Sequence, residues 1–452
     1  MSVNTTSQID LQRLLDETHP MVHSDLPDDA WLTSIRERGA KDVRRLPLPS
    51  REHEAWRYTP TAFLEQSRYR AMTDGPFEAL QLSDIDHLLL PETRGPRLVF
   101  VNGHLAPGLS LLNPQPGVAL SCLSGGLGPV NQALRCRVDE LARHEDLFGA
   151  LNSALMTDGA LIRISSDSKA KAPIEILHLT VSSDDPGICH PRHLITLDEG
   201  AKADVIERYC SLGAGDVFTI ARIDIALAPH SELRHQRLQE DGGDAKHLSR
   251  LQVRLGAHSR YEASLLCLGG RWSRADVRVT FEGEDAVAEL DGLLLAGDKQ
   301  VNDVHLDVRH EVPRCVSRET FKGILEGKGK VVFDGRILVA KDAQETDARL
   351  SNDNLMLSRS AEVDTKPQLE IYADDVKCSH GTTVGELDSG SLFYLRSRGI
   401  SKDRAVQMLC QGFAQEIIDR IPDESLRRRA GSVFARRLAD STAEPTGPES
   451  QI

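Results

Sequence analysis

Two side chains that are two residues apart, Cys378 and His380, are the first candidates for chemistry in this sequence. They lie in the segment KPQLEIYADDVKCSHGTT, residues 366–383. On an extended strand, side chains at positions i and i+2 leave the same face, so a thiolate and an imidazole would project side by side. Such a pair suits a soft or borderline metal such as iron or zinc. The structural alternative, a packed cysteine beside a surface histidine, stays open at this point.

Alternation of side chains predicts a corner just before this pair. The apolar positions from Leu369 to Ala373 share one parity. Val376 has the other parity, which it shares with Cys378 and His380. The change falls on two adjacent aspartates, so we expect the chain to turn there from one strand face to another. Parity does not decide whether Cys378 points into the protein or toward a partner.

A second set of polar side chains alternates along NDVHLDVRHEVPRC, residues 302–315. Asp303, His305, Asp307 and Arg309 share one strand face. Two acids and a histidine on one face could hold a metal. Pairing with opposite charges on neighbouring strands is the favoured interpretation, which predicts a solvated outer face. The sequence assigns no further role to His305 and Asp307.

The elements that would position these residues read as a solenoid. From about residue 98, short runs alternate apolar and polar residues, as strands do. Turn-like pieces recur near residues 200, 228, 256 and 283, in steps of 28, 28 and 27 residues. A β-sandwich does not need such a fixed register, whereas a coil that stacks on its neighbours does. We predict a mainly β protein, a parallel β-helix of about ten coils over residues 96–386.

Helical regions are expected on both sides of this core, over residues 1–95 and 387–440, and a disordered tail over 441–452. Asp388 and Ser401 are in position to cap helices, and Gly399 is in position to end one. In the C-terminal region an amphipathic stripe recurs every three to four residues and is a candidate partner-binding surface. The stripe runs over Val406, Leu409, Phe413, Ile417 and Ile421, and the first four are the candidate binding residues. Five arginines on the next helix are expected to flank that surface.

Composition limits the class of protein. The net charge of −14 argues against nucleic acid or an anionic membrane as the main partner. No apolar run approaches the length of a membrane-spanning helix, and the N-terminal segment carries acids where a secretory signal needs an apolar core. We therefore expect a cytoplasmic protein. The 8 cysteines include no CxxC pair, which favours reduced thiols and excludes a self-contained ferredoxin cluster.

Motifs of catalysis are missing from the sequence. GKGK at residues 327–330 is not a phosphate loop, because that loop needs GxxxxGK[ST] between a strand and a helix. The sequence also contains neither a GxSxG elbow nor HExxH. Cys378 and His380, as neighbours on one strand, offer no third orienting group for nucleophilic catalysis. We expect a protein that is not an enzyme and has no ATP site of its own.

Several longer segments match a known pattern. They are EAWRYTP at 54–60, LVFVNG at 98–103, ALNSALMTDGALIRI at 150–164, PRCVSRETFKGILEGKGKVVFDGRILV from 313, and CSHGTTVG at 378–385. Together they resemble the SufB/SufD family of iron–sulfur cluster assembly proteins. CSHGTTVG is more similar to the SufD branch, because SufB chains carry an acidic residue in the middle of the corresponding Cys-x-His.

The resemblance implies a right-handed β-helix and a scaffold role in the SUF assembly system. It implies pairing with a SufB-like paralogue, or a homodimer in its absence, and binding of a SufC-like ABC ATPase through the C-terminal helices. A transient iron–sulfur cluster, or iron, would be shared with SufB, with His380 as the first ligand and Cys378 as the second. The rival interpretation is a β-helix lyase or hydrolase acting on carbohydrate, which the missing export signal and the 4% aromatic content disfavour.

Overall fold

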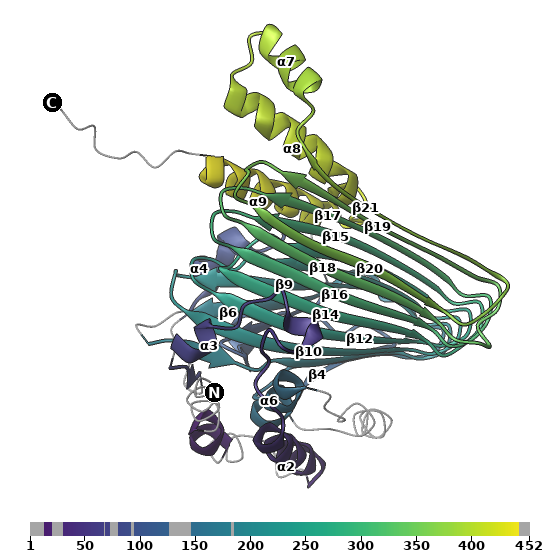
Figure 1. Cartoon of the computed structure of the whole chain (residues 1–452). Coiled ribbons are helices and arrows are strands. Elements are labelled where there is room, and N and C mark those ends of the chain that lie inside the picture. Colours follow the sequence, from purple (N-terminus) through teal and green to yellow (C-terminus); the bar gives the residue numbers. More distant parts are fainter. Residues whose placement is uncertain are drawn as a thin grey trace.

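The structure is a computed structural model that describes residues 13–19, 30–66, 68–72, 80–91, 95–125, 146–181 and 185–442. Over these residues the protein is mainly β, with a parallel β-solenoid between an N-terminal and a C-terminal group of helices (Figure 1). The predicted tail, 441–452, lies outside the described residues from 443 onward. Among the described residues, no helix is both long and apolar enough to cross a membrane.

Two sheets face each other and form the solenoid. The 11-stranded sheet contains β1 (Arg70–Ala71), β4 (Val118–Cys122), β5 (Ala160–Ile164), β7 (Gly187–Cys189), β8 (Arg192–Leu197), β10 (Val217–Leu227), β12 (Lys246–Leu255), β14 (Trp272–Phe281), β16 (Val301–His310), β18 (Lys330–Val339) and β20 (Glu362–Ile371). The 10-stranded sheet contains β2 (Arg97–Val101), β3 (His104–Leu105), β6 (Ile174–Val181), β9 (Lys202–Leu212), β11 (Glu232–Gln239), β13 (Arg260–Cys267), β15 (Val287–Ala296), β17 (Val316–Leu325), β19 (Thr346–Met356) and β21 (Val376–Glu386).

Successive strands alternate between the two sheets, so each coil adds one strand to each sheet. From β8 onward every neighbouring pair is parallel and continuously in register, for example all ten residues of β14 against β16. The parallel β-solenoid predicted from the sequence is confirmed, but it has about seven turns and not ten. The estimate was too high because it counted residues 96–164 as coils. That segment instead contains two antiparallel pairs, β2–β3 and β4–β5, and a helix.

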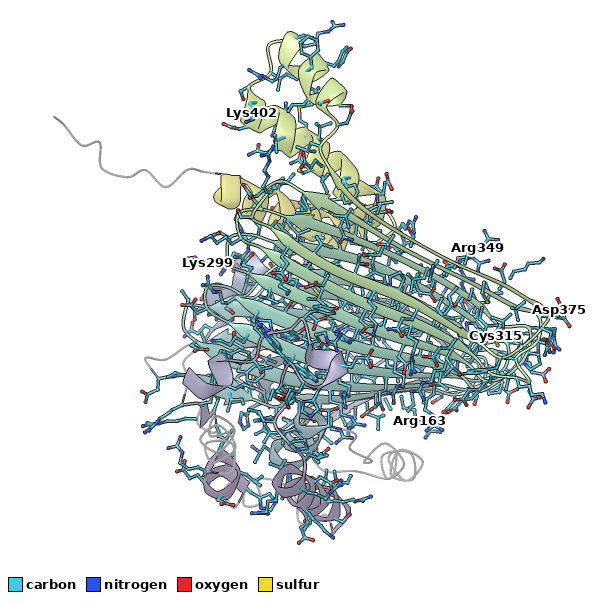
Figure 2. The ribbon with its side chains drawn as sticks, in the orientation of Figure 1. Arg163, Lys299, Cys315, Arg349, Asp375 and Lys402 are labelled. Carbon is cyan, nitrogen blue, oxygen red and sulfur yellow. The ribbon has the colours of Figure 1, made fainter. Side chains whose placement is uncertain are left out.

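One corner of the solenoid explains the repeat seen in the sequence. Each coil turns there through a residue with positive φ, between 56° and 68°, and these residues stack along the corner. They are Asp167, Gly200, His230, His258, Asp285, Arg314 and Glu345. The backbone amide of each donates to a carbonyl of the next coil, as from His258 to Glu284 at 2.8 Å and from Glu345 to Asp375 at 2.6 Å. Figure 2 shows Asp375 and Cys315 at this corner. The backbone amide of each of these turn residues is therefore hydrogen-bonded.

The core lies between the two sheets and is made of inward-facing aliphatic and aromatic side chains. Gly292 on β15 shows how closely it is packed, because a Cβ on this residue would lie 2.1 Å from a ring carbon of Phe321. The Phe321 ring in turn packs against Phe333 with centroids 5.0 Å apart. Glycine is therefore required here to leave room for an aromatic ring of the next coil.

Helices cover one part of each outer face. On the 11-stranded sheet, α6 (Leu147–Leu155) is buried along its whole length and is capped by Asp146, which accepts from Gly149 N at 2.9 Å. Asn152 ties it to the sheet by donating to the carbonyl of Ile220 at 2.8 Å. Further described helices of the N-terminal region are α2 (Ala30–Arg45), which packs on α6, α3 (Phe63–Gln66), α4 (Leu82–Ile85) and a helical stretch at 13–19. The 3₁₀ turns include η1 (Glu54–Trp56), η2 (Asp86–Leu88) and η3 (Pro107–Leu109).

On the 10-stranded sheet, α8 (Lys402–Ile418) and α9 (Glu424–Thr442) cover the outer face and form an apolar cluster with it. The predicted caps are present: Asp388 accepts from Ser391 N at 2.6 Å, and Ser401 accepts from Arg404 N at 3.4 Å. Gly399 has the expected positive φ of 85°. The first helix, α7 (Ser389–Ser397), has no buried residue and projects away from the solenoid (Figure 1).

The packing at Gly292 gives a stability prediction. Gly292→Ala should lower the free energy of unfolding by about 1–3 kcal/mol, because the new methyl group overlaps the Phe321 ring. Gly381→Ala on β21 is the matched control, since a Cβ there meets nothing within 4 Å. Urea unfolding followed by far-UV circular dichroism measures both. Equal midpoints for the two variants would contradict the packing described here.

Candidate functional site

Cys378 and His380 lie on β21, the last strand of the 10-stranded sheet and one edge of the open end of the solenoid. The predicted corner is present, because β20 ends at Ile371 and β21 begins at Val376. In the register of the sheet, Cys378 stacks on Ala348 and His380 stacks on Leu350. Both of these neighbours are buried and face the core. The two candidate ligands therefore continue inward-facing columns. Cys378 thus points into the protein, which parity alone did not decide.

The open end leaves this pair accessible. Cys378 is half-buried and packs against the core, and His380 is exposed. Burial raises the pKa of the Cys378 thiol, and the nearby carboxylates of Asp347 and Glu319 raise it further. A thiolate and an imidazole are donors that fit iron. Among the described residues, no three His, Cys, Asp or Glu side chains are placed to hold one metal ion.

Below the pair, one carboxyl group is buried in the core without a partner. Glu319 on β17 is 1% exposed, and neither of its carboxyl oxygens makes a hydrogen bond of normal geometry. Burial raises the pKa of Glu319 to about 8, and the neighbouring Ser317 hydroxyl offsets only part of that effect. Sequence reasoning missed this residue. The signal available in the sequence was strand alternation, which places Glu319 on the inward face of β17 together with Ser317 and Phe321.

Several inward positions at the open end are polar and hydrogen-bonded to one another, beside the apolar Val363 and Leu369. Thr365 on β20 donates to the side-chain oxygen of Asn352 at 2.9 Å and lies 3.1 Å from the Thr382 hydroxyl. Asn354 donates to the same Asn352 oxygen at 2.7 Å. These contacts close the two sheets over the core with polar atoms.

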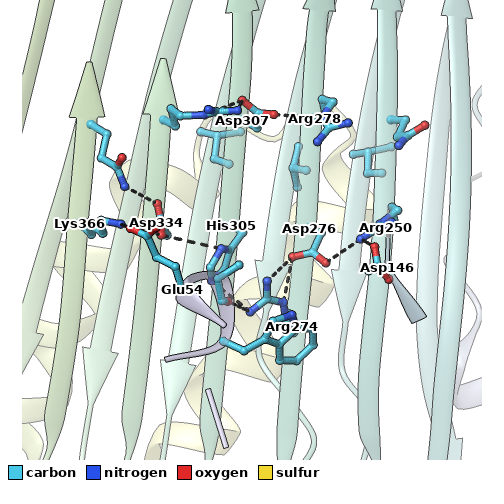
Figure 3. Close-up of a pocket in the computed structure, with 18 of the residues that line it drawn as sticks. Glu54, Asp146, Arg250, Arg274, Asp276, Arg278, His305, Asp307, Asp334 and Lys366 are labelled. Carbon is cyan, nitrogen blue, oxygen red and sulfur yellow. Dashed lines mark hydrogen bonds and ion pairs between the residues drawn. The ribbon is translucent and has the colours of Figure 1, made fainter. Parts of the chain in front are cut away.

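Of the second candidate set, His305 and Asp307 line a cleft of about 450 Å³ on the outer face of β16 (Figure 3), whereas Asp303 on the same strand is buried. The predicted charge pairs are present across the strands. Asp307 accepts from Arg278 at 3.0 Å and from Arg336 at 2.9 Å. No metal-holding group of three such side chains occurs at this cleft or elsewhere in the described parts of the chain. The cleft is therefore a network of paired charges.

The outer face is not fully solvated, because the N-terminal segment covers part of it. Asp303 is completely buried, and it accepts from Arg274 at 2.8 Å and from the Thr59 hydroxyl at 2.5 Å. Arg274 in turn stacks on the Trp56 ring at 3.9 Å. The prediction of a solvated face overlooked this segment, which is distant in the sequence from the strands that it covers. Figure 3 shows Glu54, from the same segment, beside Lys366 of β20.

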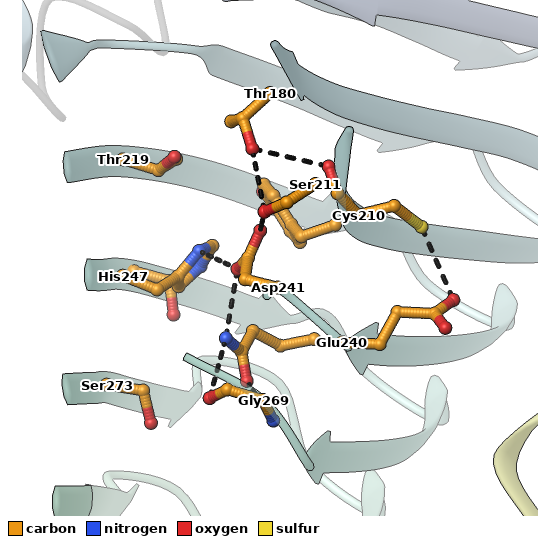
Figure 4. Close-up of polar contacts among 12 residues, drawn as sticks. Thr180, Cys210, Ser211, Thr219, Glu240, Asp241, His247, Gly269 and Ser273 are labelled. Carbon is orange, nitrogen blue, oxygen red and sulfur yellow. Dashed lines mark hydrogen bonds and ion pairs between the residues drawn. The ribbon is translucent and has the colours of Figure 1, made fainter. Parts of the chain in front are cut away.

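A buried polar network at another corner fixes α9 to the solenoid. Glu240 follows β11 and accepts from Arg208 at 2.8 Å, from the Cys210 thiol at 3.3 Å and from Arg429 of α9 at 2.7 Å. The adjacent Asp241 accepts from Gln239 at 2.9 Å, and its backbone carbonyl accepts from Arg437 at 2.7 Å. Figure 4 shows these two acids among their polar neighbours. Two of the five arginines expected to flank a partner surface are thus bound within the chain.

The stripe on α8 is also used in part by the chain itself. Ile417 is completely buried against the 10-stranded sheet, and Val406 and Phe413 are partly buried there. Leu409 is half-buried. The Lys322 ammonium group lies 4.3 Å from the centre of the Phe413 ring.

The apolar side chains left exposed in this region are at other positions. Phe393 is 74% exposed and Tyr394 is 57% exposed, both on α7, and Met408 is exposed on α8. The sequence offered a signal for this exposed surface, namely two consecutive aromatic residues in a short helix.

The buried Glu319 predicts an unusual pH dependence of stability. Its pKa is about 8 in the folded chain and near 4.5 when unfolded, so the folded chain keeps a proton that the unfolded chain loses. Its contribution to stability is present at pH 4 and is lost as the pH rises to 8, by up to about 1.4 kcal/mol per pH unit. Glu319→Gln should remove that slope and be the more stable variant at pH 7. Urea unfolding at pH 5, 6, 7 and 8 tests this, and parallel curves for the two proteins would contradict it.

Comparison with known proteins shows the family of this chain. Residues 179–413 match the model of the SufBD core domain, described as SUF system FeS cluster assembly. The chain is 34% identical to the iron–sulfur cluster assembly protein SufD of Escherichia coli, over 88% of this chain and 91% of that protein. It is 33% identical to an iron–sulfur cluster assembly SufBD family protein of Synechocystis, over 89% of this chain and 90% of the relative. A chloroplastic protein of Arabidopsis thaliana is 29% identical over 88% of this chain and 84% of its own length.

The chain belongs to the SufBD family, whose core domain is a component of the SUF system of iron–sulfur cluster assembly. Within this family it is a homologue of SufD, which supports a role in that assembly system.

Proposed function

We propose that this protein is a non-catalytic scaffold subunit of the SUF assembly complex. It pairs with a SufB-like paralogue, binds a SufC-like ABC ATPase, and contributes His380 and Cys378 to a nascent iron–sulfur cluster or to its iron. The observation that supports this most directly is the incomplete donor set at an open solenoid end. Two ligands on an accessible edge are a useful arrangement when a partner supplies the others.

The open end itself supports pairing with another solenoid. β20 and β21 are both edge strands, 10 and 11 residues long, whose outer backbone groups have no neighbouring strand. Long edges of this kind are usually covered, because they otherwise pair with other chains. Large apolar side chains are also exposed on or beside them, at Ile371, Tyr372 and Val384. A paralogue with a matching end covers both edges, and a second copy of this chain does so when no paralogue is available.

The ligand assignment predicts a specific loss of cluster. In the complex co-expressed with its SufB-like and SufC-like partners, His380→Ala should lower iron and sulfide content without separating the subunits, and Cys378→Ala should do so more weakly. Removing one ligand weakens metal binding, whereas the interface keeps its buried area. Size-exclusion chromatography with iron and sulfide analysis measures both properties. Ser379→Ala, on the same strand and facing outward, is the control. Full iron and sulfide in the double variant would refute the assignment.

The projecting helix α7 and the exposed side of α8 are proposed as the ATPase-binding surface. No residue of α7 is buried, so its packing within the chain gives it little reason to be a stable helix. Its exposed aromatic side chains, Phe393 and Tyr394, are the type that anchors protein interfaces. The exposed Met408 extends the same apolar surface onto α8. The stripe predicted from the sequence contributes through the exposed parts of Val406, Leu409 and Phe413.

The proposed ATPase-binding surface predicts that negative charges on α7 prevent binding. Phe393→Asp combined with Tyr394→Asp should abolish co-purification of the ATPase and leave the solenoid folded and paired with its paralogue, because no residue of α7 is buried. Leu112→Asp changes another exposed apolar residue, far from α7 in the sequence, and is the control that should bind normally. Affinity pull-down and far-UV circular dichroism are the measurements. Unchanged ATPase binding by the double variant would place the surface elsewhere.

A further inference from the structure

We propose that residues 54–59 form a strap that clamps β20, the edge strand of the 11-stranded sheet, to the middle of the solenoid. These residues belong to the EAWRYTP segment, which neither the ligand pair nor the ATPase-binding surface uses. The strap lies on the outer face of the 11-stranded sheet, where Figure 3 shows its first residue, Glu54, beside Lys366 of β20. The value of this clamp for pairing with a paralogue rests on the proposed function, whereas the clamp itself is a property of the free chain.

Buried contacts anchor the strap on the middle coils. Trp56 is buried and packs on Phe148 of α6, with ring centroids 5.4 Å apart. Its ring also lies 3.9 Å from the guanidinium group of Arg274 on β14, and the same arginine donates to the preceding backbone carbonyl of the strap at 2.8 Å. Thr59, which is also buried, donates to Asp303 of β16 at 2.5 Å. These contacts fix the segment over β14 and β16.

Two side chains of the strap reach from this anchor toward the last coils. Glu54 accepts a hydrogen bond from Lys366, in the middle of β20, at 2.6 Å. The ring centre of Tyr58 lies 5.9 Å from the ammonium group of Lys330 on β18. Lys330 in turn forms an ion pair of 2.6 Å with Glu362, the first residue of β20. The strap therefore acts on β20 at two points, once directly and once through β18.

The packing of β20 itself shows why such a clamp matters. No residue of β20, all of which the structure describes, is buried, and among the described strands one edge of β20 has no neighbour. A coil of a solenoid contacts only the next coils, so the last coil depends on a single neighbour. Segments with few buried apolar contacts open locally at a low free energy. The strap contacts β14, β16, β18 and β20, which are four successive strands of the sheet, so it joins the last coil to coils that it does not touch directly.

The strap acts on one of the two edge strands only. β21 belongs to the 10-stranded sheet, on the opposite side of the core from the strap, and in the structure its residues are also all at least partly exposed. A partner at the open end therefore meets one edge, β20, that is held in register before binding. Pairing with a preformed edge costs less ordering entropy than pairing with a strand that opens and closes. The strap thus prepares β20 for the partner and leaves the strand of Cys378 and His380 unclamped.

Hydrogen–deuterium exchange of the free, full-length chain, read by mass spectrometry, tests the clamp. The strap variant is Glu54→Ala combined with Tyr58→Ala. Both side chains are exposed, so their removal leaves the buried anchor at Trp56 and Thr59 in place. We expect amides of β20 to exchange about fivefold faster or more, because an exposed ion pair and an exposed cation–π contact are each weak but act on the same strand. Amides of β21 and of β12 should exchange as in the wild type.

Glu52→Ala combined with Tyr58→Phe is the matched control. It removes an equal charge from the same exposed turn and keeps the aromatic ring beside Lys330, so β20 should exchange as in the wild type. Wild-type exchange of β20 in the strap variant, or equal acceleration in β20, β21 and β12, would overturn the clamp.

Pairing with the SufB-like paralogue is a separate measurement, made by titration with the purified partner. The strap variant should bind the paralogue more weakly by a factor similar to the change in β20 exchange. If the wild type does not bind the paralogue although β20 exchange responds as expected, the proposed function fails and the clamp is supported. The two failures are thereby distinguished, because exchange is measured on the free chain.

Discussion

The continuous register of the parallel ladder is the constraint on which the rest of this structure depends. Each coil buries its inner side chains only because the next coil lies on it with the same inward parity. The chain can vary the length of a coil only at the corners, so the coil from Arg260 to its partner Val287 is shorter than the coil from Lys330 to its partner Glu362. Every residue within the strands keeps its column in spite of these differences. Inward side chains therefore stack in columns along the solenoid. Glu319 and His380 lie in the same column although they come from different coils.

The same constraint makes the ends of the ladder special. A middle coil has both faces of its backbone paired, whereas β20 and β21 have one edge without a neighbour. The chain prepares this end with inward polar residues, such as Thr365, Asn352 and Thr382, that hydrogen-bond across the two sheets. Cys378 and His380 occupy the same layer. An interface and a ligand pair thus share one surface, so a partner that completes the ladder also encloses the site.

The sequence was sufficient for those features that follow from local pattern. Strand alternation and the recurring turns predicted a parallel solenoid, because the positive-φ corner residues repeat at nearly constant spacing. Parity also placed Cys378 and His380 on one face and located the corner before them. Features that depend on stacking were not predictable in the same way. The burial of Asp303 under Thr59 and the use of Arg429 by Glu240 join residues that are 244 and 189 positions apart. The coil count failed because a helix and two antiparallel pairs occupy residues counted as coils.

Two buried carboxyl groups in this core show opposite effects of the fold on their charge. In the N-terminal half, Glu207 is buried but bound by Arg237 at 3.1 Å, His235 at 2.9 Å and the Tyr209 hydroxyl at 2.5 Å. Those contacts hold the pKa of Glu207 well below its usual range, so it is a satisfied anion. Glu319 is equally buried, lacks such partners and has the opposite shift. One carboxyl group is thus neutralised by the fold itself. The other, two coils from the open end, is kept protonated by burial at pH values where a surface carboxyl group is ionised.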